Sequence, residues 1–298
     1  MKEVSICICT RKREDELKKL LESIENMHRP DNIVVSIVII ENDLSNYSEH
    51  IVKEFSSRSE YSIRYFLEKN QGISNARNRS VKESSSADFC CFVDDDQIVD
   101  SEWMVELIKC QMEFNADGVT GPNPPVFPED VPSYIEKFHQ PLEYSYGSIV
   151  ETAFTNCLLL KKEFLDNIKG PFDIRLNFTG GEDSYLTFLI SKMGGIIRSN
   201  PNAIAYEIVP SKRTTIKYIL KRQYRISNTG IYVKLLKKEK TKKVQFLPRL
   251  LMRFGLGLLI AVPFFIFGKI NKLKGLLKIS DAVGGFIYII GKENKFYK

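Results

Sequence analysis

Apolar runs of strand length alternate with amphipathic stretches of helix length through the first two-thirds of this 298-residue chain. The runs are hydrophobic at nearly every position, which is typical of strands buried on both faces. This alternation predicts an α/β fold, with a Rossmann-like, mostly parallel sheet covered by helices on both faces. We expect the first strands at residues 4–9, 33–40, 61–67 and 88–93, and the first helices at residues 14–27, 47–55 and 73–83.

The segment that follows each predicted strand is unusually polar. In open α/β sheets, ligands bind beyond the carboxyl ends of the strands, so these segments are candidates for a binding site. They are residues 10–13, 41–43, 70–72 and 94–96. A proline-rich connection, residues 121–132, separates this half from a second group of elements that includes a helix at residues 182–193.

Three consecutive aspartates, Asp94, Asp95 and Asp96, follow a buried strand directly. Carboxylate oxygens at a strand end suit a hard divalent cation, and such a cation suits a diphosphate. The alternative is a solvated acidic turn that caps a helix starting near residue 101. The position at a strand end favours the metal site.

A glycine pair precedes Glu182 and Asp183 at the start of a helix. Two carboxylates there are ordinary, because they complement the positive end of the helix dipole. Alternatively, one of them is a general base that accepts a proton from an attacking hydroxyl. A base that activates the attacking hydroxyl and a metal that stabilises the leaving group are the two parts that a group transfer needs. The separate metal site predicted in this chain therefore favours the general base.

Residues 70–78 place Gly72 before a helix whose first turns carry Arg77 and Arg79. Backbone amides and an arginine at a helix start suit a phosphate group. A surface helix with solvated arginines would give the same pattern.

The charge of the chain is strongly asymmetric. Residues 211–298 contain 21 Lys and Arg against 3 Asp and Glu, a net charge of +18, whereas the preceding residues have a net charge of −12. A basic tail can bind nucleic acid or anionic lipid. Two apolar blocks in the tail, about residues 247–268 and 282–291, favour a membrane surface over nucleic acid. They predict an inserted or interfacial helical hairpin, the alternative being a buried helical pair.

The six cysteines lie mostly in apolar runs and not at zinc-ligand spacings, so we expect core residues. The chain enters a strand pattern at once, without the pattern of a secretion leader. Both features predict a reducing cytoplasm.

Together, six segments resemble family 2 glycosyltransferases of the GT-A fold: CICTRKR, IIENDLS, NQGISNARN, FVDDDQ, TNCLLLKKE and GGEDSYL. The resemblance covers residues 3–230, and the tail is similar to that of bacterial enzymes that build exopolysaccharide or lipopolysaccharide. It implies a GT-A catalytic domain over residues 1–210 and a basic, membrane-associated helical region over residues 211–298.

The resemblance also implies residue roles. Asp183, with Glu182 beside it, would be the catalytic base, and Asp96 and Asp94 would hold Mn²⁺ or Mg²⁺. The residues that would bind the nucleotide-sugar are Thr10, Arg13, Glu41, Asn42, Asp43, Gly72, Arg77, Asn78, Asp94 and Asp95. Many relatives have a histidine near the position of Glu207, so a third protein ligand for the metal is not implied.

The implied activity is inverting transfer of a sugar from a nucleoside-diphosphate donor to a saccharide or polyprenyl-linked acceptor. It would take place at the cytoplasmic face of the plasma membrane, during synthesis of a bacterial surface polysaccharide. One rival is a nucleotidyltransferase, but residues 9–15 lack the glycine-rich phosphate loop that it usually needs. A non-catalytic, membrane-bound subunit that retains the fold is the second rival. Binding of nucleic acid ranks below both.

Overall fold

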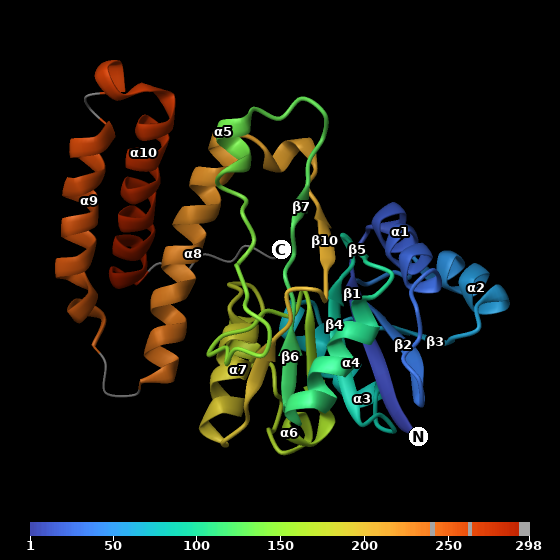
Figure 1. Ribbon diagram of the computed structural model, residues 1–298. Helices are drawn as coiled ribbons and strands as arrows, with labels where there is room; N and C mark the ends of the chain where they lie inside the picture. The colour runs from blue at the N-terminus through green and yellow to red at the C-terminus, as the bar shows by residue number, and fades with distance from the viewer. Residues whose placement is uncertain (239–241, 262–263, 292–298) are drawn as a thin grey trace.

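The computed structural model describes residues 1–238, 242–261 and 264–291, without the side chains of residues 264–269. A seven-stranded sheet in the order β3-β2-β1-β4-β8-β6-β9 forms its centre (Figure 1). Its strands are β1 (Lys2–Thr10), β2 (Ile33–Glu41), β3 (Ser62–Leu67), β4 (Phe89–Asp94), β6 (Gly118–Thr120), β8 (Leu158–Lys161) and β9 (Ile197–Ser199). All pairings are parallel except those of β8, which is antiparallel to β4 and β6. A small sheet has the order β5-β10-β7, with β5 (Gln97–Val99), β10 (Ala205–Ile208) and β7 (Pro125–Val126).

Helices cover both faces of the main sheet because successive strand side chains point to opposite faces. In β4, Phe89, Cys91 and Val93 pack into one hydrophobic cluster, and Cys90 and Phe92 pack into another. The first cluster includes α1 (Glu14–Glu25), α2 (Glu49–Arg58) and α4 (Trp103–Phe114). The second includes residues of α3 (Ile73–Glu83), α6 (Lys162–Asp166) and α7 (Glu182–Lys192). The predicted α/β fold, with a mostly parallel sheet between two helical layers, is therefore confirmed.

The first strands end at one edge of the sheet. Cys9 pairs with Asp94 across β1 and β4, and Thr10 pairs with Glu41 across β1 and β2. The polar segments that follow these strands are thereby brought together at that edge, although they are far apart in the sequence.

The C-terminal region is helical, with α8 (Ile216–Lys237), α9 (Leu247–Ala261) and α10 (Phe264–Ile289). α8 lies between the sheet domain and the α9–α10 pair (Figure 1). A Cβ atom added at Gly284 of α10 would lie 2.1 Å from the carbonyl oxygen of Tyr224 in α8. Only glycine permits so close an approach of the two backbones. Short elements complete the chain: α5 (Ser133–Glu136), η1 (Ile174–Leu176), η2 (Ser211–Arg213) and η3 (Lys243–Phe246).

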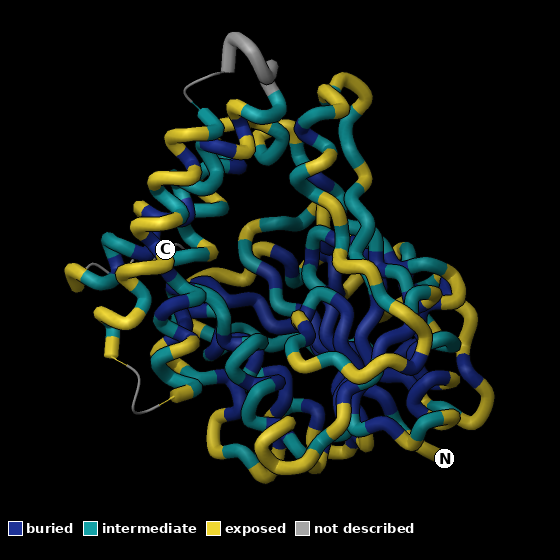
Figure 2. The backbone as a smooth tube through the Cα atoms, turned by 60° about the vertical axis from the view of Figure 1, so that its left-hand side comes forward, coloured by how far each residue is buried: buried dark blue, intermediate teal, exposed yellow. Residues whose placement is uncertain are grey.

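The two apolar blocks of the tail have different surroundings. In the block at residues 282–291, Ala282 and Tyr288 are buried against the other helices, whereas Val283 and Ile290 are exposed, so the alternative of a buried helical pair describes it only in part. In the block at residues 247–268, α9 leaves Leu251, Met252 and Leu259 exposed, and Figure 2 shows exposed stretches along this helix. Within that block, residues 262–263 lie outside the described residues. By length and composition, the segment Lys243–Ala261 could cross a membrane, and 11% of its apolar 18-residue stretch is buried.

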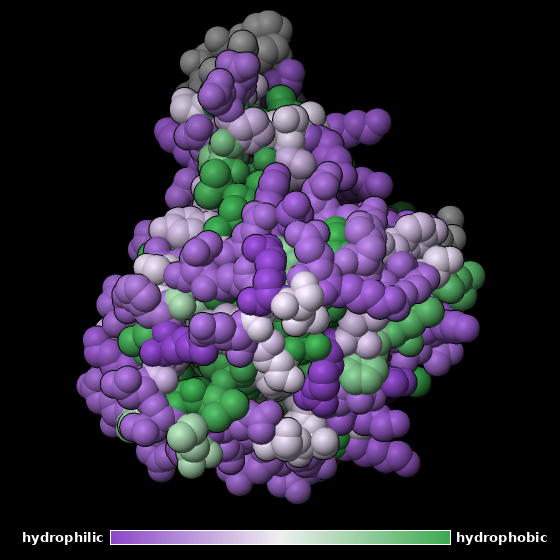
Figure 3. All heavy atoms as spheres, turned by 90° about the vertical axis from the view of Figure 1, so that its right-hand side faces the viewer, coloured by the Kyte–Doolittle hydropathy of each residue, from purple (hydrophilic) through white to green (hydrophobic). Residues whose placement is uncertain are grey.

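The side of the molecule that carries α1 and α2 is mainly hydrophilic (Figure 3).

All six cysteines are free thiols, five of them buried and Cys9 half-buried, which confirms their prediction as core residues.

Candidate active site

A cavity of about 580 Å³ lies beyond the carboxyl ends of β1, β2 and β4. This is the edge of the sheet at which α/β proteins bind ligands. Its walls come from both halves of the chain, because α8 closes the side opposite the strand ends. The lining residues are Cys9, Thr10, Arg11, Arg13, Asn42, Gly72, Ile73, Ala76, Arg77, Asp94, Asp95, Asp96, Gln97, Asn156, Glu207, Arg213, Tyr218, Arg222 and Arg225.

Arginine side chains neutralise the aspartate triplet. Arg13 Nη1 lies 2.7 Å from Asp95 Oδ1 and 3.2 Å from Asp96 Oδ2. Arg213 Nη2 lies 3.0 Å from the same Asp96 oxygen, and Arg213 Nη1 lies 3.0 Å from Glu207 Oε1. Burial raises the pKa of Asp95 to about 7, although Arg13 favours its charged form. Repulsion between the three carboxylates is thus relieved by guanidinium groups that a diphosphate could also bind.

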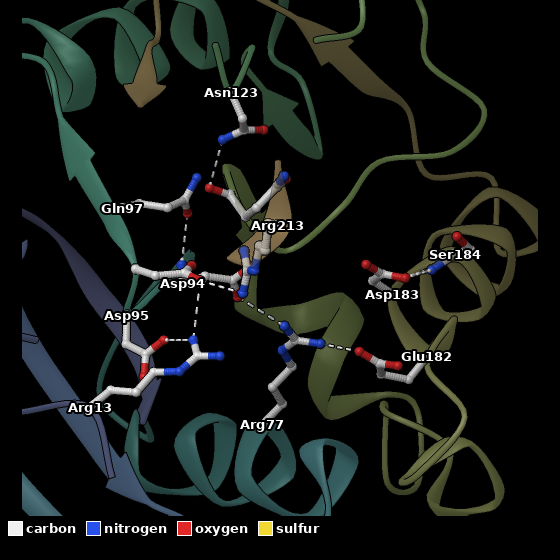
Figure 4. A network of polar contacts seen from close by, with 12 residues as sticks. Arg13, Arg77, Asp94, Asp95, Gln97, Asn123, Glu182, Asp183, Ser184 and Arg213 are labelled. Carbon is white, nitrogen blue, oxygen red and sulfur yellow. Dashed lines mark hydrogen bonds and ion pairs between the residues drawn. The ribbon is translucent and has the colours of Figure 1, made fainter. Parts of the chain in front are cut away.

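Arg77 joins the triplet to the Glu182–Asp183 pair. Its Nη2 atom lies 3.1 Å from Asp94 Oδ1, and its Nη1 atom forms a short ion pair with Glu182 Oε1 (Figure 4). The arginine projects from α3, whereas the two carboxylates come from the end of β4 and the start of α7. The two predicted acidic groups therefore lie at one place, with a buried cation between them.

Glu182 is buried and Asp183 is half-buried at the start of α7. Burial raises the pKa of Glu182 to about 7, with Arg77 lowering it and the neighbouring Asp183 raising it. Burial likewise raises the pKa of Asp183. Glu182 Oε2 is buried and has no hydrogen-bond partner among the residues that the structure describes. Asp183 Oδ1 accepts a hydrogen bond from the backbone N–H of Ser184 at 2.6 Å. Carboxylates with a raised pKa that can still lose a proton near neutral pH suit a general base. Neither residue lines the cavity.

The three predicted nucleotide-binding residues at the end of the second strand differ in their positions relative to the cavity. Glu41 is fully buried and accepts the backbone N–H groups of Lys12 and Ser48, and it does not line the cavity. Asp43, paired with Arg11 at 3.0 Å, does not line it either. Asn42 does line it, although its side chain is bonded to backbone atoms.

Gly72 and Asn78 shape the loop before α3. Gly72 has a φ of +133°, and a Cβ atom there would lie 2.4 Å from the side chain of Asn177, so a larger residue would displace the loop. Gly72 lines the cavity, and its N–H donates to Asn42 Oδ1 at 2.7 Å. Asn78 instead bonds both backbone polar groups of Phe172 and does not line the cavity.

Sequence reasoning missed the contribution of the tail to this site. Arg213 precedes α8, and Tyr218, Arg222 and Arg225 lie on the face of α8 that lines the cavity. The signal was available, because residues spaced by three or four positions share one face of a helix. Their charge had suggested only a membrane surface.

The donor set of the triplet fits a hard cation only in part. Among the residues that the structure describes, no group of three His, Cys, Asp or Glu could hold a metal. Asp94 and Asp96 offer two carboxylates beside a cavity rich in arginine. Mg²⁺ is commonly bound by one or two carboxylates, with substrate phosphates and water completing its ligands. The pair therefore suits a cation that is shared with a diphosphate.

A family model described as "Glycosyl transferase family 2" matches residues 5–171. The succinoglycan biosynthesis protein ExoM of Rhizobium meliloti (strain 1021) is 27% identical over 228 residues, which cover 76% of this chain and 73% of ExoM.

Solved structures share the fold. The mannosyltransferase PcManGT from Pyrobaculum calidifontis, in complex with GDP-Man and Mn²⁺, matches with a TM-score of 0.67 and 13% identity, over 97% of this chain and 88% of that one. Residues 1–349 of S. aureus TarS, in complex with UDP-GlcNAc, match with a TM-score of 0.54 and 13% identity, over 98% and 93% of the two chains. This chain spans 40% of a longer TarS chain.

Proposed function

The chain belongs to glycosyl transferase family 2, and we therefore propose that it is a metal-dependent, inverting glycosyltransferase. It would move a sugar from a nucleoside-diphosphate donor to a hydroxyl of a saccharide or lipid-linked saccharide, in the synthesis of a bacterial surface polysaccharide. The observation that carries the proposal is the bridge from Asp94 through Arg77 to Glu182. It links a site for the leaving group to a pair of candidate bases. The similarity to ExoM supports the polysaccharide pathway.

The arginines of the cavity would bind the diphosphate of the donor. Arg13 and Arg213 are tied to Asp96 in this structure, and Arg222 and Arg225 line the same space from α8. Guanidinium groups bind phosphate oxygens in a bidentate manner and stabilise the charge that develops on a leaving diphosphate. Asp94 and Asp96 would hold the divalent cation, which when bound acts as a Lewis acid toward the leaving group.

Asp183 would remove the proton from the acceptor hydroxyl while that oxygen attacks the anomeric carbon. A single displacement inverts the configuration at that carbon and needs no covalent intermediate. Burial would maintain the raised proton affinity of Asp183, while Glu182 would hold in place Arg77, whose charge favours the ionised form of Asp183. The protein would act at the cytoplasmic face of the plasma membrane, held there by the basic tail and the exposed apolar face of α9.

Asp96 provides the direct test of this function. We expect nucleotide-sugars, screened with Mn²⁺, to raise the melting temperature of the wild-type protein, because a ligand of the native state stabilises it. In Asp96→Ala, Mn²⁺ should no longer strengthen donor binding in calorimetry. Without metal, the variant should bind the donor at least as well as wild type, because Arg13 and Arg213 are released from Asp96.

The exposed Asp31 provides the matched control, since Asp31→Ala removes a carboxylate far from the cavity lining and should keep the response to Mn²⁺. An undiminished effect of Mn²⁺ in Asp96→Ala would contradict the metal site. Failure of every nucleotide-sugar to bind or be turned over would contradict the enzyme function and favour a non-catalytic subunit.

The dependence of transfer on pH should reflect the raised pKa of the carboxylate pair. The base must be deprotonated, so kcat should fall as pH decreases through the pKa of the pair. Because burial raises the pKa of both Glu182 and Asp183, we expect this fall at a pH above about 4, the usual carboxyl range. The two groups titrate together, so the profile gives the pKa of the pair.

Glu182→Gln should move the acidic limb of this profile to lower pH. The substitution removes the ion-pair partner of Arg77 and so leaves this guanidinium free to stabilise the charged form of Asp183, whose pKa it lowers. A limb that stays in place in Glu182→Gln would show that Glu182 does not influence the base.

A further inference from the structure

A second cavity, of about 260 Å³, lies between α8, η3, α9 and α10, on the opposite side of α8 from the first. The two cavities share no lining residue. Arg222 and Arg225 of α8 line the first, whereas Gln223, Ile226 and Lys234 of the same helix line the second. The residues that line the second cavity are Gln223, Ile226, Ser227, Gly230, Ile231, Lys234, Phe246, Arg249, Leu250, Arg253 and Asp281.

Basic side chains outnumber acidic ones in the lining of the second cavity. Lys234, Arg249 and Arg253 line it together with one carboxylate, Asp281. That carboxylate is buried, forms an ion pair with Arg253 and accepts a hydrogen bond from Gln223 Nε2 at 2.9 Å. Within the described part of the chain, no acidic side chain forms an ion pair with Lys234 or Arg249. Partial burial and the charges of the two arginines lower the pKa of Lys234.

Lys234 and Arg249 are exposed, so solvent screens part of their mutual repulsion, and a bound anion would neutralise the rest. Because Lys234 and Arg249 come from different helices, the tertiary fold itself has brought to one cavity two cations that have no ion-pair partner among the described residues. An anionic group of modest size would relieve this repulsion and accept charge-assisted hydrogen bonds from both side chains.

The rest of the lining and the adjacent surface are apolar. Ile226, Ile231, Phe246 and Leu250 complete the cavity walls. The surface of α9 beside it is also apolar over one continuous face, where the exposed residues include Leu247, Leu251, Met252, Leu258 and Leu259. A ligand that satisfies both surroundings has an anionic head and hydrocarbon chains.

We propose that this cavity binds the phosphate group of an anionic membrane phospholipid, with Lys234 and Arg249 as its ligands and the apolar face of α9 in the lipid layer. This site is distinct from the donor cavity, so the proposal does not require that the donor cavity bind a nucleotide-sugar. Because α8 forms a wall of both cavities, a lipid held on one side of the helix would fix the orientation of the donor cavity toward the membrane.

The test uses the full-length protein and short-chain lipids below their micelle concentration, where no charged membrane surface exists. Dihexanoyl phosphatidylglycerol should bind saturably and raise the melting temperature followed by circular dichroism. Lys234→Gln/Arg249→Gln should bind it about tenfold or more weakly, because two charge-assisted contacts are lost. The melting temperature of this variant without lipid should equal or exceed that of wild type, since repulsion is removed.

Two control variants locate the effect. Lys217→Gln/Lys221→Gln removes the same charge from exposed positions of α8 outside both cavities, and should bind the lipid like wild type. Asp96→Ala alters the donor cavity and should also bind it normally, which separates this site from the proposed transferase function.

Inorganic phosphate and dihexanoyl phosphatidylcholine serve as comparison ligands that show which parts of the lipid the cavity recognises. Both should bind more weakly than phosphatidylglycerol, because the first has no apolar chain and the second has a compensating positive charge. If inorganic phosphate gave an equal stabilisation that depended on Lys234 and Arg249, the lipid assignment would be wrong. Equal binding of phosphatidylglycerol by wild type and by Lys234→Gln/Arg249→Gln would overturn the site itself.

Discussion

Asp183→Asn should abolish sugar transfer and leave donor binding intact. The asparagine side chain has nearly the same volume, and its oxygen can still accept the N–H of Ser184 that Asp183 accepts. It cannot accept the proton of an acceptor hydroxyl. Loss of a general base lowers the rate by a factor on the order of a hundred to ten thousand, and we expect the upper part of this range because the site is buried. Single-turnover kinetics and calorimetry with the donor measure the two quantities separately.

Glu182→Gln is the control for Asp183→Asn, because the neighbouring residue at the start of α7 carries the same kind of charge and is more deeply buried. We expect it to retain transfer at high pH, where Asp183 is ionised. If Glu182→Gln lost transfer at every pH and Asp183→Asn kept it, Glu182 would be the base. Loss of donor binding in Asp183→Asn would instead place Asp183 in the donor site.

Much of the fold could be predicted because the pattern of apolar residues along the chain depends on the local geometry of strands and helices. A strand buried on both faces, such as β4, must be apolar throughout, and α1 must carry Leu17, Leu20, Leu21 and Ile24 on one face. Elements of this kind can be located without knowledge of their partners. For the same reason the polar ends of β1, β2 and β4 could be predicted to meet, since parallel strands end at one edge.

The roles of individual side chains were harder to predict, because they depend on partners that are distant in the sequence. Glu41 is a carboxylate at the correct edge of the sheet, yet the N–H groups of Lys12 and Ser48 turn its side chain away from the cavity. Arg213 is far from Asp96 in sequence but pairs with it at 3.0 Å. The residues that surround Glu41 and Arg213 in the sequence do not indicate the contacts that these two side chains make in the fold.

The tail illustrates an ambiguity of apolar helices. Lipid tails and a protein interior are both apolar, so composition does not distinguish them. Gly284, where α10 meets the backbone of Tyr224, marks the side of the tail that packs against protein. The exposed leucines of α9 mark the side that does not.

The bridge formed by Arg77 should also be a main determinant of stability. Arg77→Met leaves Glu182 buried without its cation, and removing one partner of a buried ion pair costs about 3–5 kcal/mol. Without Arg77 the pKa of Glu182 should rise further. The folded state would then favour protonated Glu182, so the destabilisation should be greatest above pH 7 and should decrease as the pH falls. Urea denaturation at several pH values measures this change.

Arg77→Met/Glu182→Gln separates the structural role of the bridge from its chemical role. The double variant contains no uncompensated charge at this pair, and Asp94 retains access to solvent, with 42% of its side chain exposed. We therefore expect most of the lost stability to return and its pH dependence to disappear, because replacing both partners of a buried pair is often close to neutral. Transfer should remain impaired, since Arg77 no longer neutralises charge on the departing diphosphate. Recovery of activity together with stability would mean that Arg77 only supports the fold.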